Sequence, residues 1–165
     1  MTSKKPDVPG RRSVEPLNGR AARAAALNAL ARRDLASEDL RRKLTEKGYD
    51  SRIVAALIEA LRTEKLIDDA RYVENFVAYH AARGQGPVRV RSALRQKGLE
   101  GDLVEACLVA YPDWMMQLHQ ARLKKFGLAE SSNYSETQRQ ARFLSYRGFT
   151  SAQIRSALGI DLDVD

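Results

Sequence analysis

Three glycines spaced fifty residues apart constrain the fold of this chain more than any other feature. Gly48, Gly98 and Gly148 each follow a basic residue, and each lies four positions after a leucine and directly before an apolar or aromatic residue. Glycine adopts positive φ without a Cβ clash, and many helices end on such a residue, with the next side chain packed back on the last turn. Three such endings in one register predict a tandem repeat. The expected contact pairs are Leu44 with Tyr49, Leu94 with Leu99, and Leu144 with Phe149.

An apolar stripe follows each glycine and predicts one further helix in each repeat. After Gly48, apolar residues recur at helical spacing from Ile53 to Leu61, and similar patterns follow the other two glycines. No segment alternates apolar and polar residues over the length of a strand. We therefore expect an all-α fold, an elongated, curved array of three tandem three-helix repeats. The predicted parts are a disordered basic arm (1–18), repeats at 19–67, 68–112 and 113–160, and an acidic tail (161–165).

Capping residues mark the expected helix starts. Ser37 is expected to cap the second helix of the first repeat. Asp68 and Asp69 are expected to cap the helix that begins at about residue 69 and to complement its positive end. Pro87 suits the first position of a helix. Further caps are expected at Asp50 or Ser51, at Ser135 with Gln138, and at Thr150 with Gln153.

Charge and composition narrow the possible partners and the compartment. The formal charge of +7 favours an anionic partner, such as nucleic acid or an acidic protein face, although an ordinary soluble helical protein can carry the same charge. The single cysteine, Cys107, excludes an intrachain disulfide and lies on an apolar stripe, where a buried small side chain is expected. No apolar run is long enough to span a bilayer. We expect a cytoplasmic protein without membrane contact.

Residues suited to catalysis do not gather in the sequence. His80 and His119 have no partner at a metal-ligand spacing, and no glycine-rich phosphate loop occurs. The best carboxylate cluster is Asp68, Asp69 and Glu74, which helix capping explains better than a magnesium site. We therefore expect no enzymatic activity, no catalytic residue, no metal site and no cofactor.

Basic residues recur on the second helix of each repeat and form the candidate binding site. A stacked array would place them in a recurring row suited to a polymer of repeating charge, such as a nucleic-acid backbone or a protein filament. A solvated helix face is the alternative for any single arginine. Arg32 and Arg33 are expected to lie off this row. The basic row comprises Arg41, Arg42, Lys43, Lys47, Arg89, Arg91, Arg95, Lys97, Arg139, Arg142 and Arg147.

The middle of the chain resembles the RecX family. The resemblance rests on Leu66-Ile67-Asp68-Asp69-Ala70-Arg71-Tyr72, on the turn Arg83-Gly84-Gln85-Gly86-Pro87, and on the helix end Leu94-Arg95-Gln96-Lys97-Gly98. It extends over about residues 20–160 and includes the copies of the helix end at Gly48 and Gly148. The third repeat departs from the pattern, because Gln140 stands where the earlier repeats have Leu40 and Val90, and weaker packing is expected there.

The resemblance implies a non-enzymatic, cytoplasmic regulator of the RecA recombinase in DNA repair, homologous recombination and the SOS response. Members of the family are built from three tandem three-helix repeats. They bind the RecA nucleoprotein filament and depress its ATPase, strand-exchange and co-protease activities, and some also bind DNA. For this chain the resemblance implies the RecA filament as partner, with weak binding to single- or double-stranded DNA. A monomer is expected.

Other functions stay open on the residues alone. The first is a stand-alone DNA-binding helical module, since three-helix units with tight turns resemble helix-turn-helix pieces. Base stacking in such a module would need exposed aromatic rings. The helical spacing of Tyr72, Tyr79 and Trp114 among other apolar residues favours the core instead. The remaining alternatives are a scaffold for another acidic protein and an enzyme, for which no set of converging titratable groups is apparent.

Overall fold

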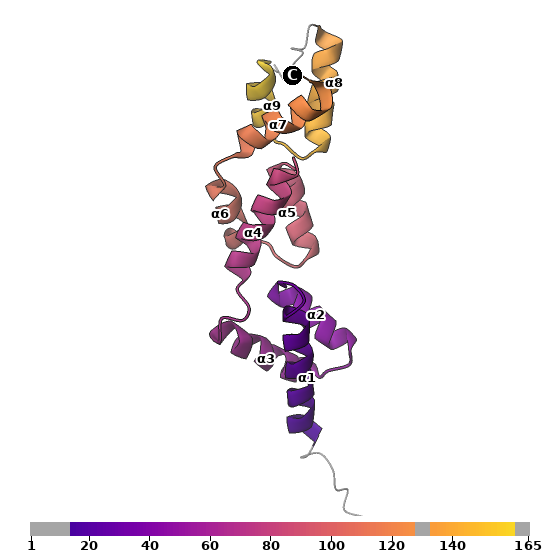
Figure 1. The fold of residues 1–165 in the computed structure, drawn as a ribbon, viewed down its shortest axis with the longest axis vertical. Helices are drawn as coiled ribbons and strands as arrows, with labels where there is room; N and C mark the ends of the chain where they lie inside the picture. Colours follow the sequence, from indigo (N-terminus) through magenta and orange to yellow (C-terminus); the bar gives the residue numbers. More distant parts are fainter. Residues whose placement is uncertain (1–13, 128–132, 161–165) are drawn as a thin grey trace, which may run out of the picture. The chain divides into compact units, whose positions relative to one another are not determined.

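The computed structural model describes residues 14–127 and 133–160, which form nine α-helices and no strand (Figure 1). The acidic tail predicted at 161–165 lies outside the described residues, as do positions 1–13 of the predicted arm. The arm was predicted to extend to residue 18, but the first helix already begins at Val14. The helices are α1 (Val14–Leu30), α2 (Ser37–Glu46), α3 (Ser51–Thr63), α4 (Asp69–Ala82), α5 (Pro87–Gln96), α6 (Asp102–Ala110), α7 (Trp114–Phe126), α8 (Tyr134–Tyr146) and α9 (Ser151–Leu158).

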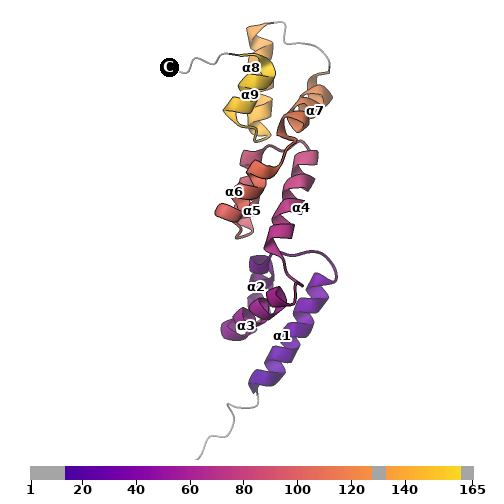
Figure 2. The same cartoon turned by 90° about the vertical axis from the view of Figure 1, so that its left-hand side faces the viewer.

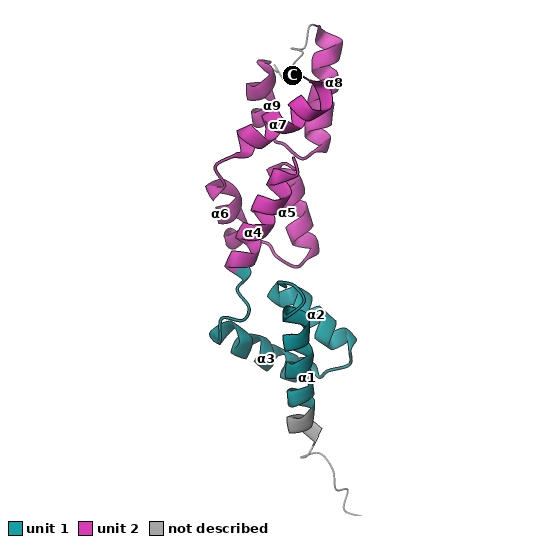
Figure 3. Cartoon of the chain, viewed as in Figure 1, with its two compact units in different colours: residues 1–69 teal, residues 70–165 magenta. Residues whose placement is uncertain are grey.

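The chain divides into two compact units (Figure 3). Unit 1 comprises residues 1–69 and contains α1 to α3, whereas unit 2 comprises residues 70–165 and contains α4 to α9. In unit 1, α1 packs along α2 and α3 (Figure 2). The core of unit 1 consists of buried side chains that include Leu40, Val54, Ile58 and Leu61. Unit 1 is therefore the first three-helix repeat, and unit 2 is formed by the second and third repeats together.

The three predicted helix endings are confirmed. The φ angles of Gly48, Gly98 and Gly148 are 88°, 76° and 90°. In each case the N–H of the residue after the glycine donates to the carbonyl of the leucine five positions earlier, at 3.2, 3.0 and 3.1 Å. These bonds satisfy carbonyls that a helix end otherwise leaves open. The same local chemistry therefore ends α2, α5 and α8.

Two predicted caps are wrong, because other groups bind the first N–H groups of those helices. Ser37 is the first residue of α2 rather than its cap, and the capping position is held by Ala36. Helix α8 is capped by Asn133, whose side chain accepts from the Glu136 N–H at 2.9 Å, and not by a box at Ser135. The caps predicted at Asp50 and at Thr150, and the placement of Pro87 at the start of α5, are confirmed.

The turn between α4 and α5 packs closely on the end of α8 within unit 2. The N–H of Gly86 donates to the Arg147 carbonyl at 2.8 Å, and the N–H of Val88 donates to the Gly148 carbonyl at 3.0 Å. A Cβ on Gly86 would lie 2.3 Å from the Gly148 carbonyl, so only glycine permits this approach. The turn motif Arg83-Gly84-Gln85-Gly86-Pro87 thus joins the second repeat to the third.

Gln140 packs in the third repeat despite its polarity. Its side chain is 1% exposed. Its Oε1 accepts from the Arg122 Nε at 2.6 Å, and its Nε2 donates to Glu136 at 3.3 Å. A buried amide costs little free energy when it is hydrogen-bonded. Arg122 therefore compensates for the loss of the apolar side chain present in the other repeats.

Candidate partner-binding surfaces

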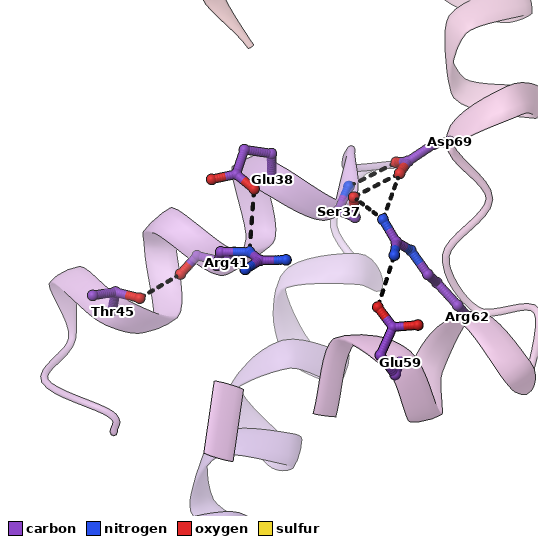
Figure 4. Close-up of polar contacts among 7 residues, drawn as sticks. All are labelled: Ser37, Glu38, Arg41, Thr45, Glu59, Arg62 and Asp69. Carbon is purple, nitrogen blue, oxygen red and sulfur yellow. Dashed lines mark hydrogen bonds and ion pairs between the residues drawn. The ribbon is translucent and has the colours of Figure 1, made fainter. Parts of the chain in front are cut away.

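Most residues of the predicted basic row are engaged within their own unit. On α2, Arg41 pairs with Glu38 at 3.1 Å (Figure 4) and Arg42 pairs with Asp39 at 2.5 Å. On α5, Arg95 lies 3.5 Å from Glu100, with both side chains about 70% exposed. The remaining engaged members are Arg89, whose Nη1 donates to the Tyr146 carbonyl at 3.4 Å; Lys97, 6.0 Å from the Phe76 ring centroid; and Arg139, paired with Glu136 at 3.1 Å.

Arg91 serves a structural contact between α5 and α6. Its guanidinium forms two hydrogen bonds with the Glu105 carboxylate, at 2.6 and 2.8 Å. These hydrogen bonds lower the pKa of Glu105, against a smaller opposing effect of desolvation, and raise the pKa of Arg91. The pair is bidentate, which is the strongest geometry for a guanidinium and a carboxylate. Arg91 is therefore a poor choice for probing partner binding, because its loss also loosens α5 from α6.

Arg147 also has a structural role. Its Nε donates to the Gly84 carbonyl at 2.9 Å and its Nη2 donates to the Arg83 carbonyl at 2.6 Å. The guanidinium thus satisfies two carbonyls at the end of α4, where the helix dipole is negative. This contact fastens the third repeat to the turn between α4 and α5.

Lys43, Lys47 and Arg142 have no ion-pair partner in the described parts of the chain. Lys43 and Lys47 lie on and just after α2 in unit 1, and Arg142 lies on α8 in unit 2. Their continuity with the rest of the row across the two units stays a prediction.

Asp69 lies at the start of α4, as predicted, but its carboxylate also binds a different helix. It lies in the first turn of α4, but its carboxylate accepts from the N–H and the hydroxyl of Ser37, at 2.8 and 2.6 Å (Figure 4). Arg62 joins both residues, donating to the Ser37 Oγ at 2.8 Å and to Asp69 at 3.1 Å. Asp69 therefore caps α2 and ties the segment after α3 to it. Asp69 thus has a structural role in unit 1.

Exposed tyrosines beside arginines gather around the turn between α4 and α5. Tyr79 is 58% exposed and carries the Arg83 guanidinium 5.2 Å from its ring centroid, whereas Tyr146 is 77% exposed and carries Arg89 at 5.5 Å. Arg147 links the two pairs through its bond to the Arg83 carbonyl. We call these five residues the arginine–tyrosine cluster. The prediction that Tyr79 lies in the core is wrong, while Trp114 is buried as predicted, with its indole N–H bonded to the Leu108 carbonyl at 2.9 Å.

Sequence reasoning missed a groove between α1 and α2. The groove has a volume of about 950 Å³ and brings Arg32 and Arg33 together with Lys43 and Lys47. The first two were expected off the basic row, because they follow α1 rather than lie on a second helix. Their place on the same groove was not visible in the sequence, since it depends on how α1 packs on α2.

Other kinds of site find little support in the described residues. No three His, Cys, Asp or Glu side chains cluster as a metal ion requires within the described ranges, and none of the described helices has the length and apolarity to cross a membrane. Cys107 is half-buried, and burial, followed by the nearby charge of Glu74, raises the pKa of its thiol. A raised thiol pKa lowers the fraction of reactive thiolate.

Comparison with known families matches all three repeats in order. Residues 22–61 match the model of the first three-helix domain of RecX, residues 68–108 match the second and residues 115–158 match the third. The chain is 41% identical over 138 residues to the regulatory protein RecX of Halorhodospira halophila, covering 83% of this chain and 86% of that protein. It is 40% identical to the regulatory protein RecX of Pseudomonas savastanoi pv. phaseolicola, covering 78% and 84% of the two chains.

Solved structures share the fold. The crystal structure of RecX from Lactobacillus salivarius matches with a TM-score of 0.78 at 20% identity, over 87% of this chain and 96% of that one. A second crystal structure of regulatory protein RecX matches with a TM-score of 0.75 at 21% identity, over 88% of this chain and 73% of that one. At such identities the likeness concerns the fold alone.

Proposed function

The chain belongs to the RecX family, and on that premise we propose that it is a non-enzymatic regulator that binds the RecA nucleoprotein filament in the cytoplasm. In this proposal it inhibits the ATPase, strand-exchange and co-protease activities of the filament. The observation that supports the proposal most strongly is the match of all three repeats to RecX domains in their proper order. The name of the relatives, regulatory protein RecX, agrees with a regulatory role.

The two units suggest how such a regulator works without chemistry. Each unit presents its own cations, so each supplies a separate weak contact to a filament of repeating subunits. Two linked contacts bind more tightly than either contact alone, because the second binds at a high effective concentration. A protein held at two subunits restrains their relative motion, and ATP turnover that depends on this motion slows.

The direct test measures RecA ATP hydrolysis on single-stranded DNA with and without the full-length protein. We expect hydrolysis to fall as the protein saturates the filament. Unchanged hydrolysis at concentrations that saturate binding, established by filament pull-down across salt concentrations, would refute the proposal.

A pair of variants tests the contribution of the exposed cations. Arg95→Gln combined with Arg142→Gln removes two exposed charges of unit 2 that have weak or no ion pairing. Arg20→Gln combined with Arg52→Gln removes the same charge from exposed positions of α1 and α3 outside the row. We expect the first pair to weaken filament binding more than the second, with helix content unchanged by circular dichroism. Equal losses would show that only net charge matters.

A second candidate function, stand-alone DNA binding, is favoured by the arginine–tyrosine cluster. Exposed aromatic rings beside guanidinium groups suit the bases and phosphates of single strands. If the chain is a stand-alone DNA-binding module, it should bind bare DNA as tightly as it binds the filament, and its affinity for DNA should fall steeply with salt. If the chain regulates the filament, it should bind bare DNA more weakly than it binds the filament and without sequence preference. Titrations of the same oligonucleotide with and without RecA distinguish the two.

A further inference from the structure

The groove between α1 and α2 of unit 1 combines an apolar floor with a cationic rim. Alanines of α1 form the accessible floor, among them Ala24, Ala25 and Ala29, whereas the leucines beneath them are buried in the core of unit 1. The alanines leave room above α1, because they carry only a methyl group. The volume of about 950 Å³ accommodates a short segment of another chain. The rim carries Arg32, Arg33, Lys43 and Lys47.

The rim charges are not neutralised within the described part of the chain. None of the four cations forms an ion pair there. The only carboxylate in the lining is that of Glu46, which lies 3.9 Å from the Arg42 Nε. A groove walled by low-dielectric side chains and lined by one sign of charge concentrates ligands of the opposite sign.

The third repeat shows what such a groove accepts. In unit 2, Ala121 of α7 and Arg147, just after α8, face the end of α4. The Arg147 guanidinium binds the Arg83 and Gly84 carbonyls, and a Cβ added to Gly84 would lie 3.1 Å from the Ala121 Cβ, so there is little room there for a side chain. The occupant is therefore a polypeptide segment that presents oxygen acceptors to a cation and small groups to an alanine. Lys47 holds the repeat position of Arg147, so we expect the groove of the first repeat to favour a segment of similar chemistry.

The residues that line the groove favour a protein partner over a nucleic-acid partner. The phosphates of a nucleic acid suit the rim, but its bases need stacking surfaces or polar groups on the floor. The only aromatic ring in the groove lining is Tyr49, and its hydroxyl is engaged with the Ala21 carbonyl at 3.3 Å. The floor otherwise offers the methyl groups of the alanines, which suit small apolar side chains, and one polar group, the Asn28 amide.

We propose that this groove binds an acidic segment of a partner protein, with apolar side chains between its carboxylates. The carboxylates pair with the rim cations, and the apolar side chains lie on the alanine floor. The proposal goes beyond the inhibition of a filament, because it specifies the chemistry that the first repeat recognises in any partner.

The test uses the full-length protein and fluorescence anisotropy of a labelled nonapeptide in which Asp and Leu alternate. Two probes serve as comparisons, a peptide of the same length in which Ser replaces Leu and an oligothymidylate with the same number of negative charges. We expect the Asp–Leu peptide to bind at least about tenfold more tightly than either comparison at 150 mM salt, where screening weakens purely ionic binding. Equal binding of all three probes would overturn the proposal in favour of unspecific attraction, and preference for the oligothymidylate would identify a nucleic-acid site.

Variants locate the site. Lys43→Gln combined with Lys47→Gln is expected to lower the affinity for the Asp–Leu peptide about tenfold. Arg20→Gln combined with Arg52→Gln is expected to change that affinity less than about twofold. Ala24→Leu narrows the groove at an exposed position of α1 without changing charge, and it is expected to weaken the peptide as well. Peptide affinity that survives both groove variants, with the fold retained by circular dichroism, contradicts the proposal. Concentration-dependent self-association that these variants abolish would instead assign the groove to a second copy of the chain.

Discussion

Gly148 and Gly48 hold the same repeat position in different surroundings. Both have φ near 90°, which costs a residue with a Cβ about 1 to 2 kcal/mol. Around Gly48 a new Cβ meets nothing within 4 Å, whereas at Gly148 it would lie 2.4 Å from the Arg89 Cβ and 2.6 Å from its backbone nitrogen. The backbone nitrogen cannot turn aside as a side-chain end can. A substitution at Gly48 therefore introduces only conformational strain, whereas a substitution at Gly148 adds steric overlap to the same strain.

We therefore expect Gly148→Ala to destabilise the protein more than Gly48→Ala. The Gly48 variant should lose about 1 to 2 kcal/mol from the φ angle alone, and the Gly148 variant about 1 to 3 kcal/mol more from overpacking. Urea unfolding followed by circular dichroism measures both. Similar losses in the two variants would mean that the contact between the α4–α5 turn and the end of α8 gives way without cost.

Sequence reasoning succeeds for residues whose surroundings are local and fails for those whose partners are distant. The three glycines were predicted because a helix end is decided within about six residues. The role of Asp69 was not, since its carboxylate binds Ser37, thirty-two residues earlier in the chain. The groove that Arg32 and Arg33 share with two lysines was missed for the same reason, because it is formed by packing of α1 on α2.

At the scale of elements, the start of α2 depends on Asp69. The Ser37 side chain is buried, and its N–H and hydroxyl both donate to that carboxylate. We expect Asp69→Ala to destabilise unit 1 by about 1 to 3 kcal/mol, because it leaves buried donors without an acceptor. A double-mutant cycle with Ser37→Ala measures the coupling by chemical unfolding. Additive losses would show that the two side chains do not act together.

Helices α5 and α6 are joined by the Arg91–Glu105 pair, whose contribution depends on pH. The hydrogen bonds from Arg91 lower the Glu105 pKa in the folded protein. A lowered carboxyl pKa stabilises the fold above the unfolded value, about 4.3, and this stabilisation is lost as pH falls through the folded value. Both side chains are more than a third exposed, so we expect the pair to contribute less than about 1 kcal/mol to the free energy of unfolding.

The measurement is thermal unfolding of the parent and of Glu105→Gln between pH 6 and pH 3. The parent should be more stable at pH 6, and the difference should shrink toward pH 3 as Glu105 takes up a proton. The difference at pH 6 should also shrink in 1 M salt, which screens exposed charges. A constant difference across the pH range would show that the carboxylate charge contributes nothing.

Helix boundaries show the same limit of local reasoning. The start of α5 follows from Pro87, which favours the first turn of a helix by its own geometry. The start of α8 was misread, because several polar residues near Asn133 are competent caps and only one of them takes the position. Gln140 was expected to weaken the third repeat, but Arg122, on a different helix, supplies the hydrogen bond that its burial requires.

At the scale of the whole molecule, each unit has a core of its own. Fully buried side chains of unit 1 include Ile58 and Leu61, and those of unit 2 include Val77, Leu94 and Leu118. Stability in proteins is often divided in this way into units that open separately. For a regulator proposed to contact its filament at two places, separate units allow each contact to form without strain in the other.

We expect a core defect to stay within its unit. Ile58→Ala should destabilise unit 1 by about 2 to 5 kcal/mol, because Ile58 is fully buried and the change leaves a cavity. Native-state hydrogen exchange should then accelerate in α2 and α3, while the amides of α5 and α8 exchange as in the parent. Leu118→Ala, in unit 2, is the matched control and should give the reverse pattern. If either substitution accelerates exchange equally in both units, the molecule opens as one cooperative block, and binding through two independent contacts loses its structural basis.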